Sequence, residues 1–467
     1  MRSGWMSWRC ILKYFIILLF MLVAGNAHAL NWEIVPVDET GDVGWFASIA
    51  LDHQDVPGIA YCDYGVGDLK FARMGDVQWL VMTVDATGNT GWYASLRFDS
   101  NDLPRIAYWD LTNSALRYAR WDGTAWQKET VDNAAYVGQS CSLALDALDR
   151  PHISYYDYTN GDLKYAHWDG TAWIIEVLDT GPPQMGTGLY TSLVLDPSGY
   201  PHISYADHTQ YLLRYAFWNG SAWVKETVDG GTPIGTSLEL DAEGDAHISY
   251  AYQFGQGSHL KYAVRDHETS TWTVRIVRPG GDAGWYSSLE LDAAGNPSIL
   301  SWELGDHLVQ FDRYDGSSWT HENVEAMDWV DQWCSLALDR YGRAHAAYRR
   351  SGTLDLHYAL GSEPAGLSDR QLPVRLLLPV RDGRCLVVEP NPAFGSAEVR
   401  FNLGRAAPVR LTAVDVTGRL LGTLWDGLHS AGETSFVLDR GRVPAGVSFL
   451  VLQAAGETAT QKVIRVE

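Results

Sequence analysis

Short hydrophobic runs separated by turn residues recur along most of the chain. Residues 140–179 hold four runs rich in Val, Ile, Leu, Tyr and Trp, each closed by Asp, Gly, Asn or Pro. This alternation predicts four antiparallel strands. We place them at Ser142–Asp146, His152–Asp157, Leu163–Trp168 and Trp173–Asp179. Variants of this four-strand unit fill the sequence from Leu30 to Leu360.

The unit occurs seven times. Its first strand reads S-h-x-h-D, where h is hydrophobic, and the serine recurs about every 48 residues, a spacing typical of a four-stranded propeller blade. These serines are Ser48, Ser95, Ser142, Ser192, Ser237, Ser288 and Ser335. The last strand of the unit begins with a tryptophan that stands six residues before a charged residue. These tryptophans are Trp32, Trp79, Trp126, Trp173, Trp223, Trp272 and Trp319.

The two series are out of phase. The chain begins with a last strand, Trp32–Asp38, and its seventh repeat ends after a third strand, Leu354–Leu360. We therefore expect the first strand to complete the seventh blade, because a closed ring has no exposed edge. The predicted fold is all-β: a seven-bladed β-propeller over residues 30–360, closed by its N-terminal strand.

The first residues have the features of a secretory signal peptide. Met1–Ala29 combines Arg2, Arg9 and Lys13 with an apolar run, Tyr14–Val23, and ends in Ala-His-Ala. The apolar run is shorter than the roughly 20 residues that span a bilayer. We expect this segment to be removed, leaving no transmembrane segment; an uncleaved N-terminal anchor is the alternative.

A second domain follows the propeller. Residues 361–384 predict a linker around a short apolar run, and residues 385–467 predict a small immunoglobulin-like β-sandwich. Its strands are expected near Val387–Glu389, Ala397–Asn402, Val409–Val416, Thr434–Val437, Ser448–Ala454 and Thr458–Val466.

The order of motifs in this second domain carries a family resemblance. The motifs are N-P at Asn391-Pro392, V-x-L-x-x-x-D-x-x-G-R at Val409–Arg419, S-A-G at Ser430–Gly432, P-A-G-V-S-F at Pro444–Phe449 and K-V-I-R-V at Lys462–Val466. The domain resembles the C-terminal sorting domains of bacterial type IX secretion cargo and the related immunoglobulin-like domain of the flagellar hook-capping protein. Ser448 departs from the tyrosine usual in that family. The resemblance implies a contact with the secretion machinery and a location outside the cell, secreted or on the outer surface of a Gram-negative-type bacterium.

Composition narrows the range of partners. The chain carries 35 Lys and Arg against 57 Asp and Glu, a net charge of −22. This acidic balance repels phosphate, which disfavours nucleic acid as a partner. It suits solubility and the capture of cations or neutral polyols. The four cysteines after the signal peptide form no recognisable disulfide framework, so we expect packed thiols. No cofactor is indicated, and calcium stays possible.

Four hairpins share an aromatic pattern. W-D-G-T-A-W occurs at Trp121–Trp126 and Trp168–Trp173, W-N-G-S-A-W at Trp218–Trp223 and Y-D-G-S-S-W at Tyr314–Trp319. Asp-Gly and Asn-Gly are strong hairpin signals because both central residues tolerate positive φ. The hairpins resemble those of fungal fucose-binding propeller lectins, and their position resembles that of sialidase Asp boxes. The sialidase sequence S-x-D-x-G-x-T-W and an arginine triad are absent, so a sialidase is disfavoured.

A candidate ligand site combines aromatic and charged residues on one face. The loops before the first strands of several blades hold G-W-F or G-W-Y, and most second strands end in a carboxylate. By strand direction both features emerge on the same rim, in the sector formed by blades 6, 7, 1 and 2. The candidate ligand-binding residues are Trp45, Trp92, Trp285, Trp333, Asp63, Asp110, Glu303 and Arg349. In the structural alternative, the carboxylates pair with cations that begin the third strands and the tryptophans are wedges between blades.

Three function classes stay open from the sequence. Aromatic platforms beside carboxylates match the apolar face and the hydroxyls of a sugar. Binding of an extracellular glycan, or of another extracellular ligand such as a protein, is therefore the first hypothesis. A glycoside hydrolase or polysaccharide lyase is the second, although no acid/base couple is recognisable. A structural or protein-binding propeller is the third.

Overall fold

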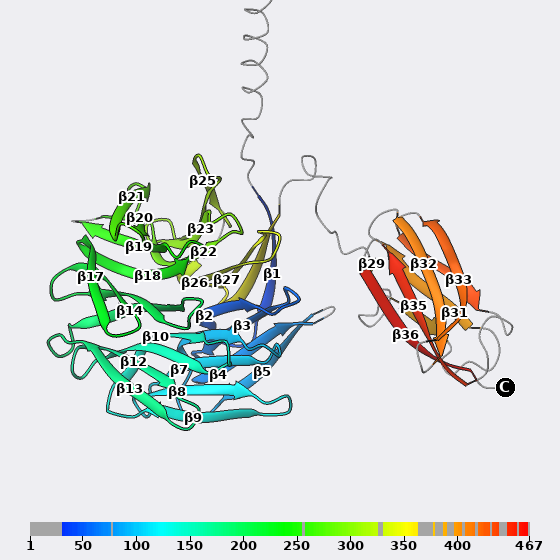
Figure 1. Ribbon diagram of the computed structural model, residues 1–467, viewed down its shortest axis with the longest axis horizontal. Helices are drawn as coiled ribbons and strands as arrows, with labels where there is room; N and C mark the ends of the chain where they lie inside the picture. The colour runs from blue at the N-terminus through cyan, green and yellow to red at the C-terminus, as the bar shows by residue number, and fades with distance from the viewer. Residues whose placement is uncertain are drawn as a thin grey trace, which may run out of the picture.

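The structure is a computed structural model of the chain. It describes residues 30–75, 78–254, 257–325 and 330–362, and in the C-terminal part the strands from Leu377 to Arg465 without most of the segments that connect them. The predicted signal peptide, Cys385 and the Asn391-Pro392 motif lie outside the described residues. Every regular element that the structure describes is a β-strand (Figure 1). No described helix could cross a bilayer.

Seven four-stranded antiparallel sheets form the blades. Blade 1 consists of β2 (Val43–Leu51), β3 (Pro57–Asp63), β4 (Asp68–Met74) and β5 (Trp79–Asp85). Blade 2 consists of β6 (Trp92–Phe98), β7 (Pro104–Asp110), β8 (Ala115–Trp121) and β9 (Trp126–Asp132). Blade 3 consists of β10 (Val137–Leu145), β11 (Pro151–Asp157), β12 (Asp162–Trp168) and β13 (Trp173–Asp179). Blade 4 consists of β14 (Thr187–Leu195), β15 (Pro201–Asp207), β16 (Leu212–Trp218) and β17 (Trp223–Gly230).

The remaining blades follow the same order. Blade 5 consists of β18 (Thr232–Leu240), β19 (Ala246–Phe254), β20 (Gly257–Asp266) and β21 (Thr271–Arg278). Blade 6 consists of β22 (Trp285–Leu291), β23 (Pro297–Glu303), β24 (Leu308–Tyr314) and β25 (Trp319–Asn323). Blade 7 consists of β26 (Val330–Leu338), β27 (Ala344–Arg350), β28 (Asp355–Ser362) and β1 (Asn31–Asp38).

The N-terminal strand closes the ring. β1 pairs antiparallel with β28, in a register that runs from Asn31 opposite Ser362 to Asp38 opposite Leu356. The chain start therefore supplies the outer strand of the last blade, and the predicted seven-bladed propeller closed by its first strand is confirmed.

The repeated serine joins neighbouring blades around the axis. The first strand of each blade is the innermost one, and its serine Oγ accepts a hydrogen bond from a backbone N–H of the next blade. Ser142 accepts from Leu193 at 3.0 Å, and Ser335 of blade 7 accepts from Ile49 of blade 1 at 3.1 Å. All seven interfaces have this bond at 3.0 or 3.1 Å. The serine recurs because every interface leaves the same inner N–H to be satisfied.

The outer-strand tryptophans are the wedges between blades. Each packs edge-on against the aromatic residue on the third strand of the preceding blade, with ring centroids 5.2 to 5.7 Å apart. Trp223, for example, lies 5.4 Å from Tyr165. This contact occurs at all seven interfaces, so these tryptophans have a structural role throughout the ring.

The inner strands begin earlier than the sequence predicts. β10 starts at Val137, five residues before the predicted start at Ser142, and its pairing with β11 shifts register between Val137 and Ser142. The G-W-F and G-W-Y segments, predicted as loops, likewise belong to β2 or to the starts of β6 and β22. The reason is a β-bulge, which interrupts the alternation of hydrophobic and polar positions by which a strand is recognised.

The C-terminal part contains two small sheets with one shared core. β29 (Leu377–Leu378), β30 (Leu386–Glu389), β31 (Ala397–Leu403) and β34 (Gly432–Leu438) form one, and β32 (Ala407–Asp415), β33 (Leu420–His429), β35 (Gly446–Ala454) and β36 (Glu457–Arg465) form the other. Side chains of both sheets meet in one hydrophobic cluster, as in a β-sandwich. β33 is absent from the sequence prediction because its glycines obscure the strand pattern, and β29 lies inside the predicted linker.

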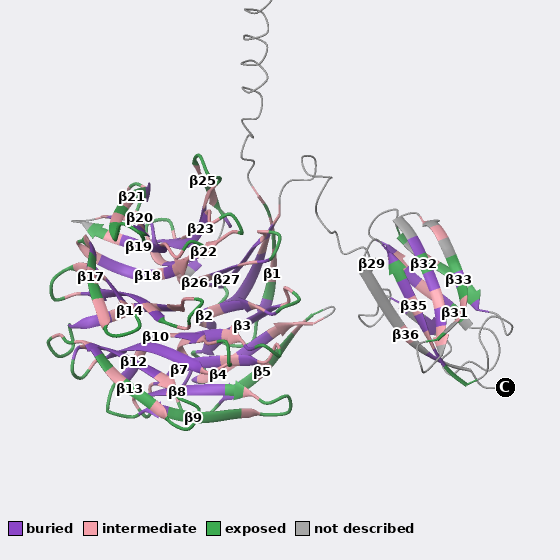
Figure 2. Cartoon of the chain, in the orientation of Figure 1, coloured by how far each residue is buried: buried purple, intermediate pink, exposed green. Residues whose placement is uncertain are grey.

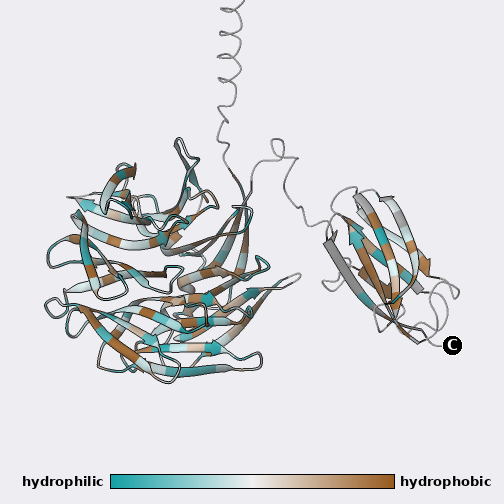
Figure 3. Ribbon diagram, viewed as in Figure 1, coloured by the Kyte–Doolittle hydropathy of each residue, from teal (hydrophilic) through white to brown (hydrophobic). Residues whose placement is uncertain are grey.

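Burial is greatest in the second strand of a blade and least in the outermost strand. The second strands are almost wholly buried, whereas most of β9 is exposed (Figure 2). Most outer strands carry polar side chains, but β13 exposes Ile174, Ile175 and Val177 (Figure 3). Cys62, Cys141 and Cys334 are buried free thiols, as predicted.

Candidate functional site

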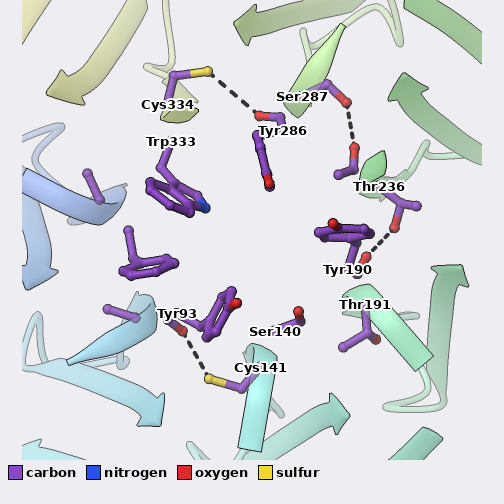
Figure 4. A pocket seen from close by; sticks show the side chains of 14 residues that line it. Tyr93, Ser140, Cys141, Tyr190, Thr191, Thr236, Tyr286, Ser287, Trp333 and Cys334 are labelled. Carbon is purple, nitrogen blue, oxygen red and sulfur yellow. Dashed lines mark hydrogen bonds between the residues drawn. The ribbon is translucent and has the colours of Figure 1, made fainter. Parts of the chain in front are cut away.

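A pocket lies on the axis of the propeller. Its volume is about 160 Å³, and each blade contributes two consecutive residues of its innermost strand to the wall (Figure 4). The first residue of each pair is Phe46, Tyr93, Ser140, Tyr190, Gly235, Tyr286 or Trp333. The second is Ala47, Ala94, Cys141, Thr191, Thr236, Ser287 or Cys334.

A left-handed backbone turns the first residue of the pair toward the axis. Phe46, Tyr93, Tyr190 and Tyr286 have φ of 55°, 53°, 52° and 49°. This region is uncommon for residues other than glycine and costs on the order of 1–3 kcal/mol per residue. It is the residue at the bulge, and the bulge places an aromatic ring where a regular strand would present a backbone edge. The rings of Tyr93, Tyr190, Tyr286 and Trp333 point into the pocket in Figure 4.

Five aromatic rings form an arc around the pocket. Neighbouring centroids are 4.5 Å apart for Tyr93 and Phe46, 4.1 Å for Phe46 and Trp333, 5.5 Å for Trp333 and Tyr286, and 5.8 Å for Tyr286 and Tyr190. We call Tyr93, Phe46, Trp333, Tyr286 and Tyr190 the axial arc.

Two blades leave gaps in the axial arc. Blade 3 has Ser140 at this position and blade 5 has Gly235. Gly235 is required sterically, because a Cβ there would come within 2.3 Å of the Cα of Tyr286.

The second residue of the pair fixes the backbone of the neighbouring blade. Cys141 Sγ donates to the carbonyl of Tyr93 at 3.0 Å, Thr236 Oγ1 to that of Tyr190 at 2.6 Å, and Ser287 Oγ to that of Gly235 at 3.0 Å. These bonds fix the backbone of Tyr93, Tyr190 and Gly235 from the neighbouring blade without a ligand.

The four predicted tryptophans divide between two positions. Trp333 lines the axial pocket directly. Trp45, Trp92 and Trp285 each stand one residue before a member of the axial arc and lie half-buried behind it. Their Nε1 atoms donate to Asp42 Oδ1 at 2.7 Å, Asn89 Oδ1 at 2.7 Å and Ser258 Oγ at 2.8 Å. They support the arc on the same face: the Trp92 centroid is 5.0 Å from that of Phe46, and the Trp45 centroid is 5.2 Å from that of Trp333.

The predicted carboxylates are buried and hydrogen-bonded within their own blades. Asp63 accepts from the N–H of Gly65 and pairs with Lys70 at 2.8 Å. Asp110 accepts from Asn113 and pairs with Arg117 at 3.3 Å.

Glu303 stands at the same position in blade 6. It accepts from the N–H groups of Gly305 and Asp306 at 2.9 and 2.6 Å. Asp63 and Asp110 thus pair with third-strand cations as in the structural alternative, whereas Glu303 caps a turn.

Arg349 also acts inside the protein. Its side chain is 3% exposed, its Nη2 lies 2.6 Å from Asp42 Oδ1, and its guanidinium carbon lies 4.6 Å from the Trp45 ring centroid. Arg349 therefore positions Trp45 through a shared acceptor and a cation–π contact.

Charged residues occupy the third position of the first-strand motif in three blades. Arg97, Glu239 and Glu290 replace the Ala or Val of the other four blades. Burial raises the pKa of Glu239 to about 7, and burial together with the charge of Glu239 raises the pKa of Glu290 well above its usual value. Arg97 opposes both shifts and donates from Nη1 to the Leu96 carbonyl at 2.8 Å.

The predicted tryptophans and the axial arc are neighbours in one sequence motif. In G-W-[FY] the tryptophan is the more distinctive ring, but the residue after it takes the left-handed conformation and faces the axis. Alignment of the seven repeats on the motif serine places Phe46, Tyr93, Tyr190 and Tyr286 in one column two residues before it. This aligned position is the sequence feature from which the residues that face the axis could have been found.

Comparisons with known proteins show the fold. No family model and no curated protein matches the chain. An ulvan lyase, described as a new family of polysaccharide lyase, is 13% identical, covers 68% of this chain and 96% of its own, and has a TM-score of 0.51. The same lyase bound to -[GlcA(1-4)Rha3S]- gives the same values. An α-L-arabinofuranosidase of Fusarium graminearum is 11% identical, covers 58% and 92%, and has a TM-score of 0.42.

Proposed function

We propose that this protein binds carbohydrate, and that the axial pocket is the binding site. The observation that carries the proposal is the axial arc: five aromatic rings at one position of the repeat, around a pocket to which all seven blades contribute. Aromatic rings match the apolar faces of sugar rings, and hydroxyl groups beside them match sugar hydroxyls. The ulvan lyase of similar fold, which is bound to an oligosaccharide in one structure, supports the same ligand class.

The chemistry of the lining favours binding over catalysis. The described lining residues include no carboxylate, histidine, lysine or arginine. Burial raises the pKa of the Tyr93, Tyr190 and Tyr286 hydroxyls, so they stay protonated at neutral pH and serve as hydrogen-bond donors. A neutral, aromatic, hydroxyl-lined pocket binds a sugar and supplies no general base.

A glycan array tests the proposal. Wild-type protein should bind a defined set of glycans, and Tyr190→Ser should bind that set at least about tenfold more weakly, the loss expected for one aromatic contact of 1–3 kcal/mol. Serine is the matched substitution because blade 3 has Ser140 at the same position. Unchanged binding by Tyr190→Ser, or a wild-type protein that binds no glycan, would refute the proposal.

A glycoside hydrolase is the second candidate, and one observation favours it. Glu239 and Glu290, from adjacent blades, have raised pKa values, and a carboxylic acid with a raised pKa beside a second carboxyl is what glycoside hydrolysis uses. Reducing-sugar release from any glycan that binds decides between the candidates. Hydrolysis that is lost in both Glu239→Gln and Glu290→Gln would establish the enzyme, and binding without sugar release would exclude it for that glycan.

We further propose that the protein acts outside the cell. The support is the predicted signal peptide and the motif order of the C-terminal sandwich, which resembles type IX sorting domains. Extracellular glycan or protein would then be the natural partner, and the secretion machinery would contact the C-terminal domain. Cell fractionation tests this: the full chain should be found outside the cell, and a chain ending at Ser362 should remain in the periplasm.

A further inference from the structure

A second cavity lies between blades 5 and 6, on the face opposite the axial pocket. Its volume is about 360 Å³. It is lined near the turns that join the first strand to the second and the third strand to the fourth, whereas the axial pocket opens near the start of the innermost strands. Three aromatic side chains, Tyr262, Tyr314 and Trp319, and three charged ones, Asp245, Asp266 and Arg275, belong to the wall. We call this cavity the interblade cleft.

At the interblade cleft an arginine takes a position that is glutamate in blades 2, 3, 4 and 6. In blades 3, 4 and 6 a glutamate stands three residues after the outer-strand tryptophan and accepts the Nε1–H of the next blade's tryptophan. The pairs are Glu176 with Trp223 at 3.3 Å, Glu226 with Trp272 at 2.9 Å and Glu322 with Trp32 at 3.3 Å. Blade 5 has Arg275 at this position, opposite Trp319 of blade 6. Arginine has no acceptor, so this bond cannot form there.

The Arg275 guanidinium is available to a ligand. Its side chain is exposed, and in the part of the chain that the structure describes it has neither a salt bridge nor a hydrogen bond. The two carboxylates beside it are partly used: Asp245 Oδ1 accepts from the N–H and Nδ1 of His267 at 2.9 and 2.6 Å, and Asp266 Oδ1 accepts from the N–H of Thr269 at 2.7 Å. Asp266 also accepts from the side chain of Thr269 and the N–H of Glu268.

We infer that the interblade cleft binds a neutral saccharide residue. Tyr314 and Trp319, whose centroids are 5.5 Å apart, offer aromatic surface for the apolar face of a sugar ring. The arginine fork can donate to neighbouring hydroxyls, and the carboxylates of Asp245 and Asp266 can accept from them because each carboxylate accepts several hydrogen bonds.

Charge selects a neutral sugar over an acidic one. Asp245 and Asp266 outweigh the single positive charge of Arg275, and the chain as a whole carries −22. An acidic saccharide would be repelled by the local charge of the cleft and by the net charge of the chain.

This site is independent of the axial pocket. The two share no lining residue and lie on opposite faces, so each can be lost without the other. A protein with both sites occupied would join two glycan chains or two parts of one chain, which raises the strength of attachment to a polysaccharide beyond that of either site.

A substitution of Arg275 by the glutamate found in other blades provides the test. Arg275→Glu gives blade 5 the residue that blades 3, 4 and 6 have, so the fold should be kept and the melting temperature unchanged or raised. Arg120→Glu, at an exposed arginine on blade 2, makes the same charge change away from the cleft. The probes are an array of neutral, uronate-containing and sulfated oligosaccharides, with affinities measured for those that bind.

The outcomes separate the two sites. We expect a subset of neutral oligosaccharides to bind Arg275→Glu at least tenfold more weakly, while Arg120→Glu and Tyr190→Ser keep their affinity for that subset. The inference is overturned if no oligosaccharide responds to Arg275→Glu, if the responsive ones are acidic, or if Arg120→Glu has the same effect. If Arg275→Glu does not fold, Arg275→Gln takes its place under the same criteria. Loss in Tyr190→Ser alone leaves the axial proposal standing and refutes the cleft.

Discussion

Two rings of aromatic residues surround the propeller axis, and they differ in how strictly the repeat maintains them. The outer ring consists of the tryptophans that begin the outermost strands, and all seven blades have one, in the same edge-on contact. The inner ring is the bulge position, which holds tyrosine in three blades and Phe46, Ser140, Gly235 or Trp333 in the others. Seven equivalent interfaces require seven equivalent wedges, so uniformity indicates a structural role.

The side chain at the inner position, in contrast, varies from blade to blade. The backbone there is held by the same kinds of bond whether the side chain is an aromatic ring or absent, since Thr236 bonds the carbonyl of Tyr190 and Ser287 bonds that of Gly235. These backbone bonds therefore do not depend on the side chain, although the close approach of Tyr286 admits only glycine at position 235. Variation at a fixed and strained backbone position is what a ligand site on a repeat scaffold requires.

The largest expected effect comes from removing the strand that completes the outer ring. A chain that starts at Asp42 loses β1, and with it Trp32 and the pairing with β28. Blade 7 would keep three strands and expose an unpaired edge. We expect cooperative thermal unfolding to be lost, as followed by circular dichroism; a transition like that of the parent protein would contradict the closure.

Removal of a single outer tryptophan should have the next largest effect. Trp223→Ala removes the contact with Tyr165 and the hydrogen bond to Glu176, and should lower the free energy of unfolding by about 3 kcal/mol. Trp223→Phe, which keeps most of the ring, should cost about half as much. If Trp223→Ala is as stable as wild type in urea denaturation, the wedge role assigned to the outer ring is wrong.

The inner serines should contribute less per residue. Ser142→Ala leaves the N–H of Leu193 without its acceptor, which costs about 1–2 kcal/mol. Ser142→Thr keeps the hydroxyl and serves as the control. Equal stability of the alanine and threonine variants would show that the serine is not what satisfies this N–H.

The smallest effect depends on pH. Burial raises the pKa of Glu239 to about 7, above the value near 4.3 of an unfolded glutamate, so the folded state binds more protons between these values. The stability from this group is complete below about pH 4 and is lost as pH rises through about 7.

Glu239→Gln should therefore unfold at a higher temperature than wild type at pH 8 and at the same temperature at pH 4. Calorimetry at the two pH values measures this. Glu129→Gln, at an exposed position on β9, should show no such difference. A Glu239→Gln variant less stable than wild type at pH 8 would contradict the assigned shift.

Much of the fold could be predicted from the sequence because the repeat is regular. The serine and tryptophan series give the number of blades, and their phase gives the closure by β1, since each marks a contact that every blade makes. The bulge could not be predicted, because the residues from Val137 to Cys141 follow no period of two. In the C-terminal domain β33 was missed for the same kind of reason, as Gly422 and Gly427 weaken its strand pattern.

The sequence prediction placed the candidate residues in blades 6, 7, 1 and 2, whereas the axial pocket is lined by all seven blades and includes Tyr190 of blade 4. Trp333 lines the pocket, whereas Trp45, Trp92 and Trp285 stand behind it. Which of two adjacent aromatic residues faces the axis depends on the sign of φ, and neither residue type reveals that. The carboxylates Asp63, Asp110 and Glu303 recur for the turns that they cap.

The most direct test measures stability and glycan affinity together for Tyr190→Ser. It asks whether the inner ring binds the ligand without contributing to the stability of the fold. The melting temperature and the dissociation constant for one array-positive glycan would be determined on the same preparation. We predict a melting temperature within about 2 °C of wild type and an affinity reduced at least about tenfold, as expected for losing one aromatic contact with the ligand. A sharply lowered melting temperature with unchanged affinity of the folded protein would contradict this account.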